Sequence, residues 1–538
     1  MKIRFLGAAR TVTGSCSVVS TKSCRFAVDC GLHQGNREID ARNWDLALYE
    51  PEKIDFLLIT HAHIDHTGLL PRLVKKGFKG PVYTTRPTHD LMEIMLQDSA
   101  YIQEMEARWK NKKRLRHGQK ALPPLYSKED VLATLPLIST RAYNEPFTPA
   151  PGVRVNFKDA GHILGSAFIE IWVEEEERTS KLVFSGDLGR PDQMIIRDPS
   201  IVEKADFLFL ESTYGNRDHK DLGASEEEMA EAIAYSYQRG EKVIIPAFAV
   251  GRTQELIFCL YHLHKQGRLP GDMPVYIDSP MATRATEVFR NHPEFFDKES
   301  RELLANGESP FDIPQVRYTQ STQESIALNN SREPSVIISA SGMCNAGRIK
   351  HHLRHNLWRE GASVVFVGFQ AQGTPGRRIV DGADMIRLFG ENVAVKARVF
   401  TIGGFSAHAG QSQILEWLSH FTNGSMQVFL LHGEYGAQQA LAKLVRERTG
   451  LEVSIPDYLE ECLLTSGRKI ARSKELRQAL PPIDWKGALG DAQDTFERLQ
   501  QRLEHVSKLT REEQAEVRDE LVDLNSHLER VISEIAGA

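Results

Sequence analysis

The feature that most constrains this chain is a group of four metal-binding side chains within six residues. They follow directly after the apolar run Phe56–Thr60, which predicts a short buried strand. The four are His61, His63, Asp65 and His66. Imidazole nitrogens suit zinc, and a carboxylate can orient or bridge metal ions. The stretch therefore predicts a metal site on a loop at the end of a strand, and four unrelated loop residues are a poor alternative.

Two more ligand candidates follow other predicted strands. His162 comes after the run Val153–Phe157, and Asp187 comes after Leu182–Phe184. A lone His or Asp in a glycine-rich loop is more often structural. Because both residues follow the first cluster in the sequence, and each comes after a further predicted strand, they are interpreted as additional ligands.

Composition excludes several classes of protein. The 538 residues include 66 Lys and Arg against 72 Asp and Glu, a net charge of −6, with 41% hydrophobic and 26% charged residues. These values are typical of globular proteins and exclude disordered, collagen-like and membrane-rich chains. The length suggests roughly three domains.

The cysteines and the N-terminal residues indicate the cellular compartment of the protein. Six cysteines without a CxxC pair indicate neither a zinc ribbon nor a disulfide framework. The N-terminus lacks the apolar core of a signal peptide, and no stretch of about 18 apolar residues occurs. A soluble protein of the cytoplasm, without membrane association, is expected.

The pattern of predicted elements changes along the chain. Up to about residue 210 it consists of short strands, whereas from Ser225 helices and strands alternate as in a doubly wound α/β unit. Ser225 and Glu228 form a capping box that predicts a helix start before Met229–Tyr237. The late strand Val428–Leu431 is expected to complete the first domain.

The tail beyond about Ser466 has a different pattern. Apolar residues at steps of three and four, from Val517 to Ile535, mark one face of a helix, and Thr510 with Glu513 forms the capping box that starts it. Two alternatives stay open: a helical hairpin, or a coiled coil that pairs two chains.

The order of the candidate ligands resembles that of a known superfamily. Asp29, the cluster from His61 to His66, His162 and Asp187 are similar to the four successive motifs of the metallo-β-lactamase superfamily. This resemblance implies an αββα sandwich with a dinuclear metal site at one edge of its sheets. The superfamily is chemically broad, so these motifs alone name no substrate.

Three later residues narrow the resemblance. Glu211, His408 and His432 are similar to motifs A, B and C of the β-CASP nucleases, which insert an α/β domain into the lactamase-like fold. Other similar segments are Pro246–Arg252, Asp278–Met281 and Ser339–Met343. The resemblance, which ends at about Ser466, divides the chain into a lactamase domain (1–215), a β-CASP domain (216–390), the completion of the lactamase domain (391–466) and a helical C-terminal extension (467–538).

The resemblance also implies roles. One zinc ion would be bound by His61, His63 and His162, and a second by Asp65, His66 and His432. Asp187 would bridge the two ions, and Asp29 would fix the orientation of the ligands. Asp65 and Asp187 would thus take part in catalysis, with His408 as general acid and Glu211 holding its imidazole.

The motif-C residue bears on the substrate. A His at that position resembles the RNA branch of the group, whereas the DNA-repair branch related to Artemis usually carries Val. The expected activity is a zinc-dependent RNA phosphodiester hydrolase for RNA processing, endonucleolytic, 5′–3′ exonucleolytic or both. It would use a hydroxide held between the metals and leave a 5′-phosphate and a 3′-hydroxyl. The alternatives are a DNA nuclease, a small-molecule metallohydrolase and a non-catalytic RNA-binding scaffold.

Candidate partners are RNA and a second copy of the chain. Hydroxyls, backbone N–H groups and guanidinium groups are expected to contact RNA phosphates. These candidates are Ser339, Ser341, Gly342, Ser406, Ala407, Arg252 and Arg348. A homodimer would form through the β-CASP domain or the tail.

Overall fold

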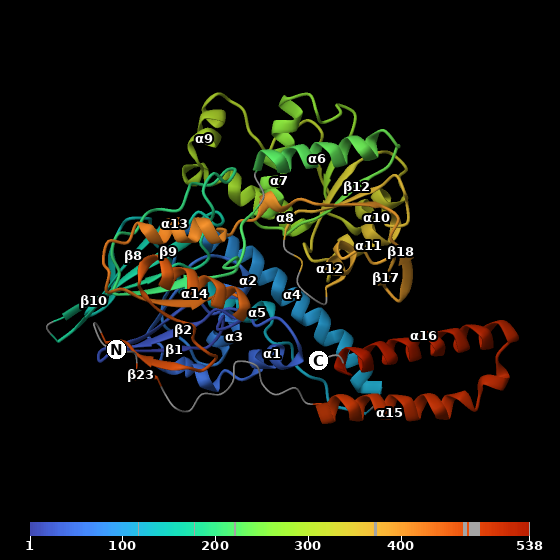
Figure 1. Ribbon diagram of the computed structural model, residues 1–538, viewed down its shortest axis with the longest axis horizontal. Coiled ribbons are helices and arrows are strands. Elements are labelled where there is room, and N and C mark those ends of the chain that lie inside the picture. Colours follow the sequence, from blue (N-terminus) through green and yellow to red (C-terminus); the bar gives the residue numbers. More distant parts are fainter. Residues whose placement is uncertain are drawn as a thin grey trace. The chain divides into compact units, whose positions relative to one another are not determined.

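The structure is a computed structural model that describes residues 1–116, 118–176, 178–219, 222–368, 370, 374–465, 471–472 and 485–536. It divides into two compact units, Met1–Leu480 and Pro481–Ala538. Figure 1 shows the sheets and helices of the first unit and the helices of the second.

Two mixed sheets form the scaffold of the first unit. The eight-stranded sheet has the order β23-β22-β1-β2-β3-β4-β5-β6, and the seven-stranded sheet has the order β21-β20-β11-β10-β9-β8-β7. The strands of the first sheet are β1 (Lys2–Phe5), β2 (Ser17–Ser20), β3 (Arg25–Val28), β4 (Phe56–Leu58), β5 (Val82–Thr84), β6 (Ile138–Thr140), β22 (Glu461–Leu463) and β23 (Ala471–Arg472). Those of the second are β7 (Phe147–Ala150), β8 (Val153–Asp159), β9 (Ala167–Glu175), β10 (Arg178–Phe184), β11 (Phe207–Glu211), β20 (Gln427–Leu431) and β21 (Glu452–Ser454).

The alternation of side chains along β11 explains the layers. Phe207 and Phe209 point into the core between the two sheets, whereas Leu208 and Leu210 point into the outer core beneath the helices. Since both faces of the strand are buried, its run is apolar throughout. Helices α13 (Gln411–Ser419) and α14 (Tyr435–Thr449) contribute to that outer core.

Helices also cover the outer face of the eight-stranded sheet. They are α3 (Leu70–Lys75), α4 (Arg86–Arg116) and α5 (Lys128–Thr134), and their apolar side chains share a core with Leu57 and Ile59. Helix, sheet, sheet and helix layers thus follow one another, and the predicted αββα sandwich is confirmed. The late strand β20 pairs with β11, as expected.

A six-stranded parallel sheet lies between β11 and β20 in the chain, and its order is β14-β13-β15-β12-β16-β19. Its strands are β12 (Val243–Pro246), β13 (Val275–Ile277), β14 (Val316–Tyr318), β15 (Val336–Ser339), β16 (Ser363–Phe366) and β19 (Arg398–Thr401). Its helices are α6 (Leu222–Tyr237), α7 (Arg252–Lys265), α8 (Pro280–Arg290), α9 (Lys298–Ala305), α10 (Thr322–Asn330), α11 (Ile349–Asn356) and α12 (Pro375–Val380). This is the inserted α/β domain, drawn from green to orange in Figure 1.

Two sequence predictions need comment here. Ser225 is wrong as a helix cap, because α6 already begins at Leu222 and Ser225 is fully buried inside it. Burial against the sheet outweighs the preference of serine for a cap. The predicted domain limits stay predictions: β19 lies beyond residue 390 and still pairs with β16, and residue 466 lies outside the described residues.

The second unit consists of helices α15 (Trp485–Leu503) and α16 (Arg511–Ala536), joined through a short 3-10 turn at Val506–Lys508. The predicted capping box is confirmed, because Glu513 N donates to Thr510 Oγ1 at 3.3 Å and Thr510 N donates to the Glu513 carboxylate at 2.8 Å. The apolar side chains that stay exposed include Trp485, Leu489, Phe496, Leu524, Leu528 and Ile532. None of the described helices, here or in the first unit, has the length and apolar character that crossing a membrane requires.

The core between the sheets yields a stability prediction. Phe209 is 2% exposed and stacks on Phe184 and Phe429, with ring centroids 4.2 and 5.0 Å away. Phe209→Ala should lower the free energy of unfolding by about 3–5 kcal/mol through the cavity it leaves. Urea unfolding measures this, with Leu132→Ala on the exposed face of α5 as the control, expected to change stability by less than about 0.5 kcal/mol. Equal urea midpoints for the two variants would contradict this account of the core.

Candidate active site

A buried carboxylate organises the segment that carries the first candidate metal ligands, a loop followed by the short helix α2 (Ile64–Thr67). β3 and β4 are parallel neighbours, so Asp29 and Thr60 meet where these strands end. Asp29 accepts hydrogen bonds from Thr60 N at 2.8 Å and from the Thr60 hydroxyl, and it lies 2.8 Å from Nδ1 of His66. A Cβ atom added to Gly31 would lie 1.6 Å from the carbonyl oxygen of Asp65, so only glycine allows this close approach. The loop is thereby held tightly against the sheet.

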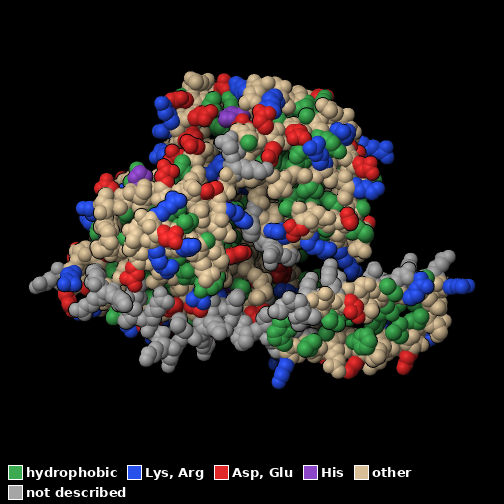
Figure 2. Space-filling model, in the orientation of Figure 1, with side chains coloured by type: hydrophobic (Ala, Val, Ile, Leu, Met, Phe, Trp, Pro, Cys, Tyr) green, Lys and Arg blue, Asp and Glu red, His purple; other side chains and the backbone are tan. Residues whose placement is uncertain are grey.

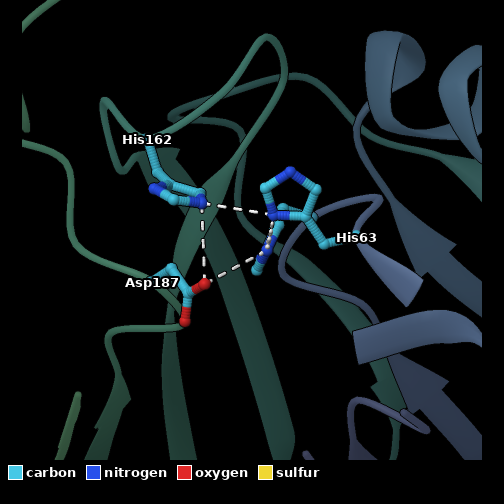
Figure 3. Close-up of side chains that lie close together, drawn as sticks. His63, His162 and Asp187 are labelled. Atoms are coloured by element: carbon cyan, nitrogen blue, oxygen red, sulfur yellow. Dashed lines mark hydrogen bonds and ion pairs between the residues drawn. The ribbon is translucent and has the colours of Figure 1, made fainter. Parts of the chain in front are cut away.

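Four side chains converge into one group of possible metal ligands: His61, His63, His162 and Asp187. Nδ1 of His63 lies 3.1 Å from Nε2 of His61 and 3.3 Å from Nε2 of His162. Oδ2 of Asp187 lies 3.4 Å from the His61 nitrogen and 3.5 Å from the His162 nitrogen. Figure 3 shows His63, His162 and Asp187 pointing toward one another. Four N and O donors at such spacing match the requirement of a tetrahedral zinc ion.

A second group lies on the other side of Asp187 and consists of Asp65, His66 and His432. Oδ1 of Asp187 lies 3.3 Å from Nε2 of His66 and 3.3 Å from Nδ1 of His432. Nε2 of His432 lies 3.4 Å from Oδ2 of Asp65. The two oxygens of Asp187 therefore face different groups, which is the arrangement of a bridging carboxylate.

The state of these buried atoms tests whether the residues fit metal ions. Nε2 of His66 and Oδ1 of Asp187 are buried and have no hydrogen-bond partner among the described atoms. An unsatisfied buried polar atom costs about 1–3 kcal/mol. A metal ion between them would satisfy both atoms, so the second group fits a metal ion, as the four donors of the first group do.

The pKa values of the first group point the same way. Burial is the main cause that lowers the pKa of His61 and His162 well below its usual range, and it lowers that of His63 to about 4. Burial alone would raise the pKa of Asp187, but the neighbouring imidazoles lower it well below its usual range. Neutral imidazoles and an ionised carboxylate are the forms that bind metals. In the second group, burial alone would lower the pKa of His66, but Asp187 and then Asp29 raise it well above its usual range.

Beside Asp187 lies a third set of side chains, the pair formed by Glu211 and His408. Nδ1 of His408 lies 3.0 Å from Oε1 of Glu211, whose carboxylate also accepts from Leu188 N at 2.8 Å and Thr213 N at 3.1 Å. Burial alone would lower the pKa of His408, but Glu211 and then Asp187 raise it to about 9. The Glu211 carboxylate thus fixes the His408 ring and favours its protonated form.

The two arginines predicted to contact RNA bind other residues of the protein. Arg348 donates to Asp278 at 2.7 Å and to Gln320 O at 2.8 Å, and Arg252 pairs with Glu255. Both guanidinium groups thus have internal partners.

The other predicted RNA contacts differ in exposure. Ser339, Gly342 and Ser406 are buried, whereas Ser341 and Ala407 are partly exposed. Contact of any of them with RNA stays a prediction.

Two threonines next to the motifs contact candidate ligands, although the sequence patterns did not predict a role for them. The Thr60 hydroxyl lies 3.1 Å from Nδ1 of His61, and the Thr213 hydroxyl lies 3.1 Å from Nδ1 of His432. Each fixes a ring that reaches the clusters. Their position beside His61 and near Glu211 in the sequence was the only available signal.

Comparison with known proteins identifies related chains. The metallo-β-lactamase superfamily profile matches residues 9–231, the Beta-Casp domain profile matches residues 253–379, and the profile of the Zn-dependent metallo-hydrolase RNA specificity domain matches residues 392–456. The chain is 38% identical to Ribonuclease TTHA0252 of Thermus thermophilus over 461 residues, 86% of this chain and 99% of that protein. It is 30% identical to the Transcription termination factor FttA of Methanocaldococcus jannaschii over 470 residues, 86% of this chain and 71% of that protein.

The arrangement around Asp29 predicts an effect on metal retention. Asp29→Ala removes the acceptor that orients His66, so affinity for metal should fall about 10–100-fold. Metal content after dialysis against a weak chelator measures this effect. Asp206→Asn is the matched control, because Asp206 accepts a backbone hydrogen bond from Lys181 N at 2.7 Å outside both groups. Equal metal retention by the two variants would refute the assigned role of Asp29.

Proposed function

Since the chain belongs to the β-CASP group of the metallo-β-lactamase superfamily, we propose that it is a metal-dependent RNA phosphodiester hydrolase, acting as an endoribonuclease, a 5′–3′ exoribonuclease or both. The observation that carries the proposal is the meeting of three groups at Asp187: two sets of candidate metal ligands and the pair formed by Glu211 and His408. A relative that shares 38% of its residues and is matched over 99% of its length is named a ribonuclease.

The proposed cofactor is a pair of zinc ions. His61, His63 and His162 would hold one ion, Asp65, His66 and His432 the other, and Asp187 would contact both. When bound, such a pair lowers the pKa of water enough to supply a nucleophile near neutral pH and neutralises charge on the phosphate. The family profile over residues 392–456, described as zinc-dependent, supports this choice of metal.

The protein's own groups would position the substrate and move one proton. Glu211 holds Nδ1 of His408, which leaves Nε2 of that ring to donate a proton to the departing sugar oxygen. The products would be a 5′-phosphate and a 3′-hydroxyl. Asp29 keeps Nδ1 of His66 occupied, so the opposite nitrogen, Nε2, remains available to the metal site.

Two features favour RNA over the alternatives. His432 occupies the motif-C position, and it lies with His408 inside the segment matched by the RNA specificity profile. A non-catalytic scaffold is disfavoured because each of the seven ligand positions carries a metal-competent side chain. A cytoplasmic location and a homodimer through the inserted domain or the tail stay predictions. A solution mass of two chains that falls to one chain on removal of residues 485–536 would support a dimer through the tail.

The substrate prediction is tested with a 5′-labelled RNA and a DNA of the same sequence. The protein should cut the RNA and leave the DNA intact, because the motif-C histidine and the matched profile both point to RNA. Chelation should abolish cleavage, and added zinc should restore it. Cleavage of the DNA at an equal rate, or cleavage of RNA that survives chelation, would rule out this proposal.

The His408 assignment predicts a specific variant. His408→Ala should slow RNA cleavage about 10²–10⁴-fold, the usual contribution of a general acid. Metal content and RNA affinity should persist, since His408 lies outside the two ligand groups. His432→Ala is the contrasting variant and should lose metal together with activity. If His408→Ala loses metal, or cuts RNA at the parent rate, the role is wrong.

A further inference from the structure

An unusual residue occupies the turn between β17 (Met385–Leu388) and β18 (Glu391–Ala394) in the inserted domain. The turn has two residues, Phe389 and Gly390, with φ of 53° and 87°. Two central residues of positive φ define a type I′ turn, in which Asn, Asp or Gly is preferred at the first position. A bulky residue there is strained, and local rules are broken mainly at functional sites. Phe389 gains little from burial in return, because it is 49% exposed.

The Phe389 ring is surrounded by side chains of α11. The ring of His351 stacks on it at 4.3 Å with an interplanar angle of 28°. Nζ of Lys350 lies 4.9 Å from the ring centroid, and the guanidinium carbon of Arg354 lies 5.6 Å from it. An aromatic ring flanked by cations is a common binding surface for single-stranded nucleic acid.

The cations of this patch lack acidic partners. Within the described part of the chain, Lys350, Arg354 and Arg387 form no ion pair, whereas Arg359 and Arg398 of the same domain are paired with Glu241 and Glu231.

The surface around these cations carries little negative charge. Arg387 is exposed on β17, and α11 and the hairpin contain a single acidic residue, Glu391. Figure 2 shows Lys and Arg side chains gathered along the lower edge of the inserted domain, where Figure 1 places α11, α12 and the hairpin. The surface is therefore suited to a polyanion.

Helix α11 is held rigidly behind the patch. Asp278, at the end of β13, is fully buried and accepts hydrogen bonds from Arg348 at 2.7 Å, His352 at 2.6 Å and Ser325 at 2.6 Å. Arg348 and His352 lie at the start of α11 and within it. The anchored helix presents Lys350 and Arg354 in fixed positions, which lowers the entropy lost on binding.

Parts of the inserted domain pack close to the loop that carries His162. A Cβ on Gly251 would lie 3.0 Å from Ile163, the neighbour of His162, and a Cβ on Gly342 would lie 3.1 Å from the ring of Phe248. Gly342 belongs to the loop that leads into α11. Phe248 is itself 47% exposed.

We propose that Phe389, Lys350, Arg354 and Arg387 form a second contact site for single-stranded RNA, outside the metal centre. A base stacks on the exposed part of the Phe389 ring, and the three cations bind flanking phosphates. The inference rests on the proposed function, because it takes RNA as the substrate. This site places part of the RNA on the inserted domain. RNA therefore binds with full affinity only when it reaches this patch.

The test compares Phe389→Asn with Phe389→Trp. Asn suits a type I′ turn, so this variant should be at least as thermally stable as the parent while losing the stacking ring. Affinity is measured by fluorescence anisotropy with a 5′-labelled single-stranded RNA and metal-bound protein, each variant also carrying His408→Ala so that cleavage is slow. Phe389→Asn should weaken binding about 5–150-fold, the range for loss of one base stack, and Phe389→Trp should retain affinity. Lys350→Ala should reduce the salt dependence of log Kd by about 0.7.

The control is Trp358→Asn, which removes an aromatic residue that is 53% exposed beside Arg359, a cation already paired with Glu241. Its affinity for RNA should match that of the parent. If the parent cuts RNA and Phe389→Asn binds it equally well, this inference fails and the proposed function stands. If Phe389→Asn lowers the solution mass without changing RNA affinity, the patch is a protein interface and the inference is overturned. A parent that neither binds nor cuts RNA refutes the proposed function itself.

Discussion

Asp187 sits where the three polar groups of the first unit meet, and the site depends on the different surroundings of its two oxygens. Oδ2 faces His61 and His162, while Oδ1 faces His66 and His432. So many buried imidazoles around one carboxylate would be costly without a cation, since each loses hydration and several atoms remain unpaired. The fold tolerates that cost because each side chain lies just after a strand or in the short helix α2, which packing holds in place.

The way the inserted domain joins the sandwich also bears on catalysis. Glu211 is the last residue of β11, before the chain enters that domain, and His408 follows soon after β19, its last strand. The two residues are thus far apart in sequence, yet they lie 3.0 Å apart where the chain leaves and re-enters the sandwich. Any shift of the inserted domain would therefore act on the position of His408 against Glu211. Under the proposed function, RNA binding on that domain would therefore be coupled to proton transfer from His408.

The parts of the structure that could be predicted from the sequence are the local ones. Strand ends carrying His61, His162 and Asp187 were recognisable because apolar runs stop at residues with metal chemistry, and the resemblance supplied the order of the motifs. The helix cap at Ser225 failed because burial in the tertiary structure overrides a local preference. The internal role of Arg348 was equally hidden, since its partner Asp278 lies 70 residues away in the chain.

A zinc titration of the metal-free protein, read by the initial rate of RNA cleavage, tests the central claim most directly. Seven ligands shared between two groups predict that the rate rises to a plateau at two equivalents of zinc per chain. The metal-free protein should show no cleavage. A full rate with one equivalent or less, or cleavage that does not respond to zinc, would contradict the account of two metal sites joined by Asp187.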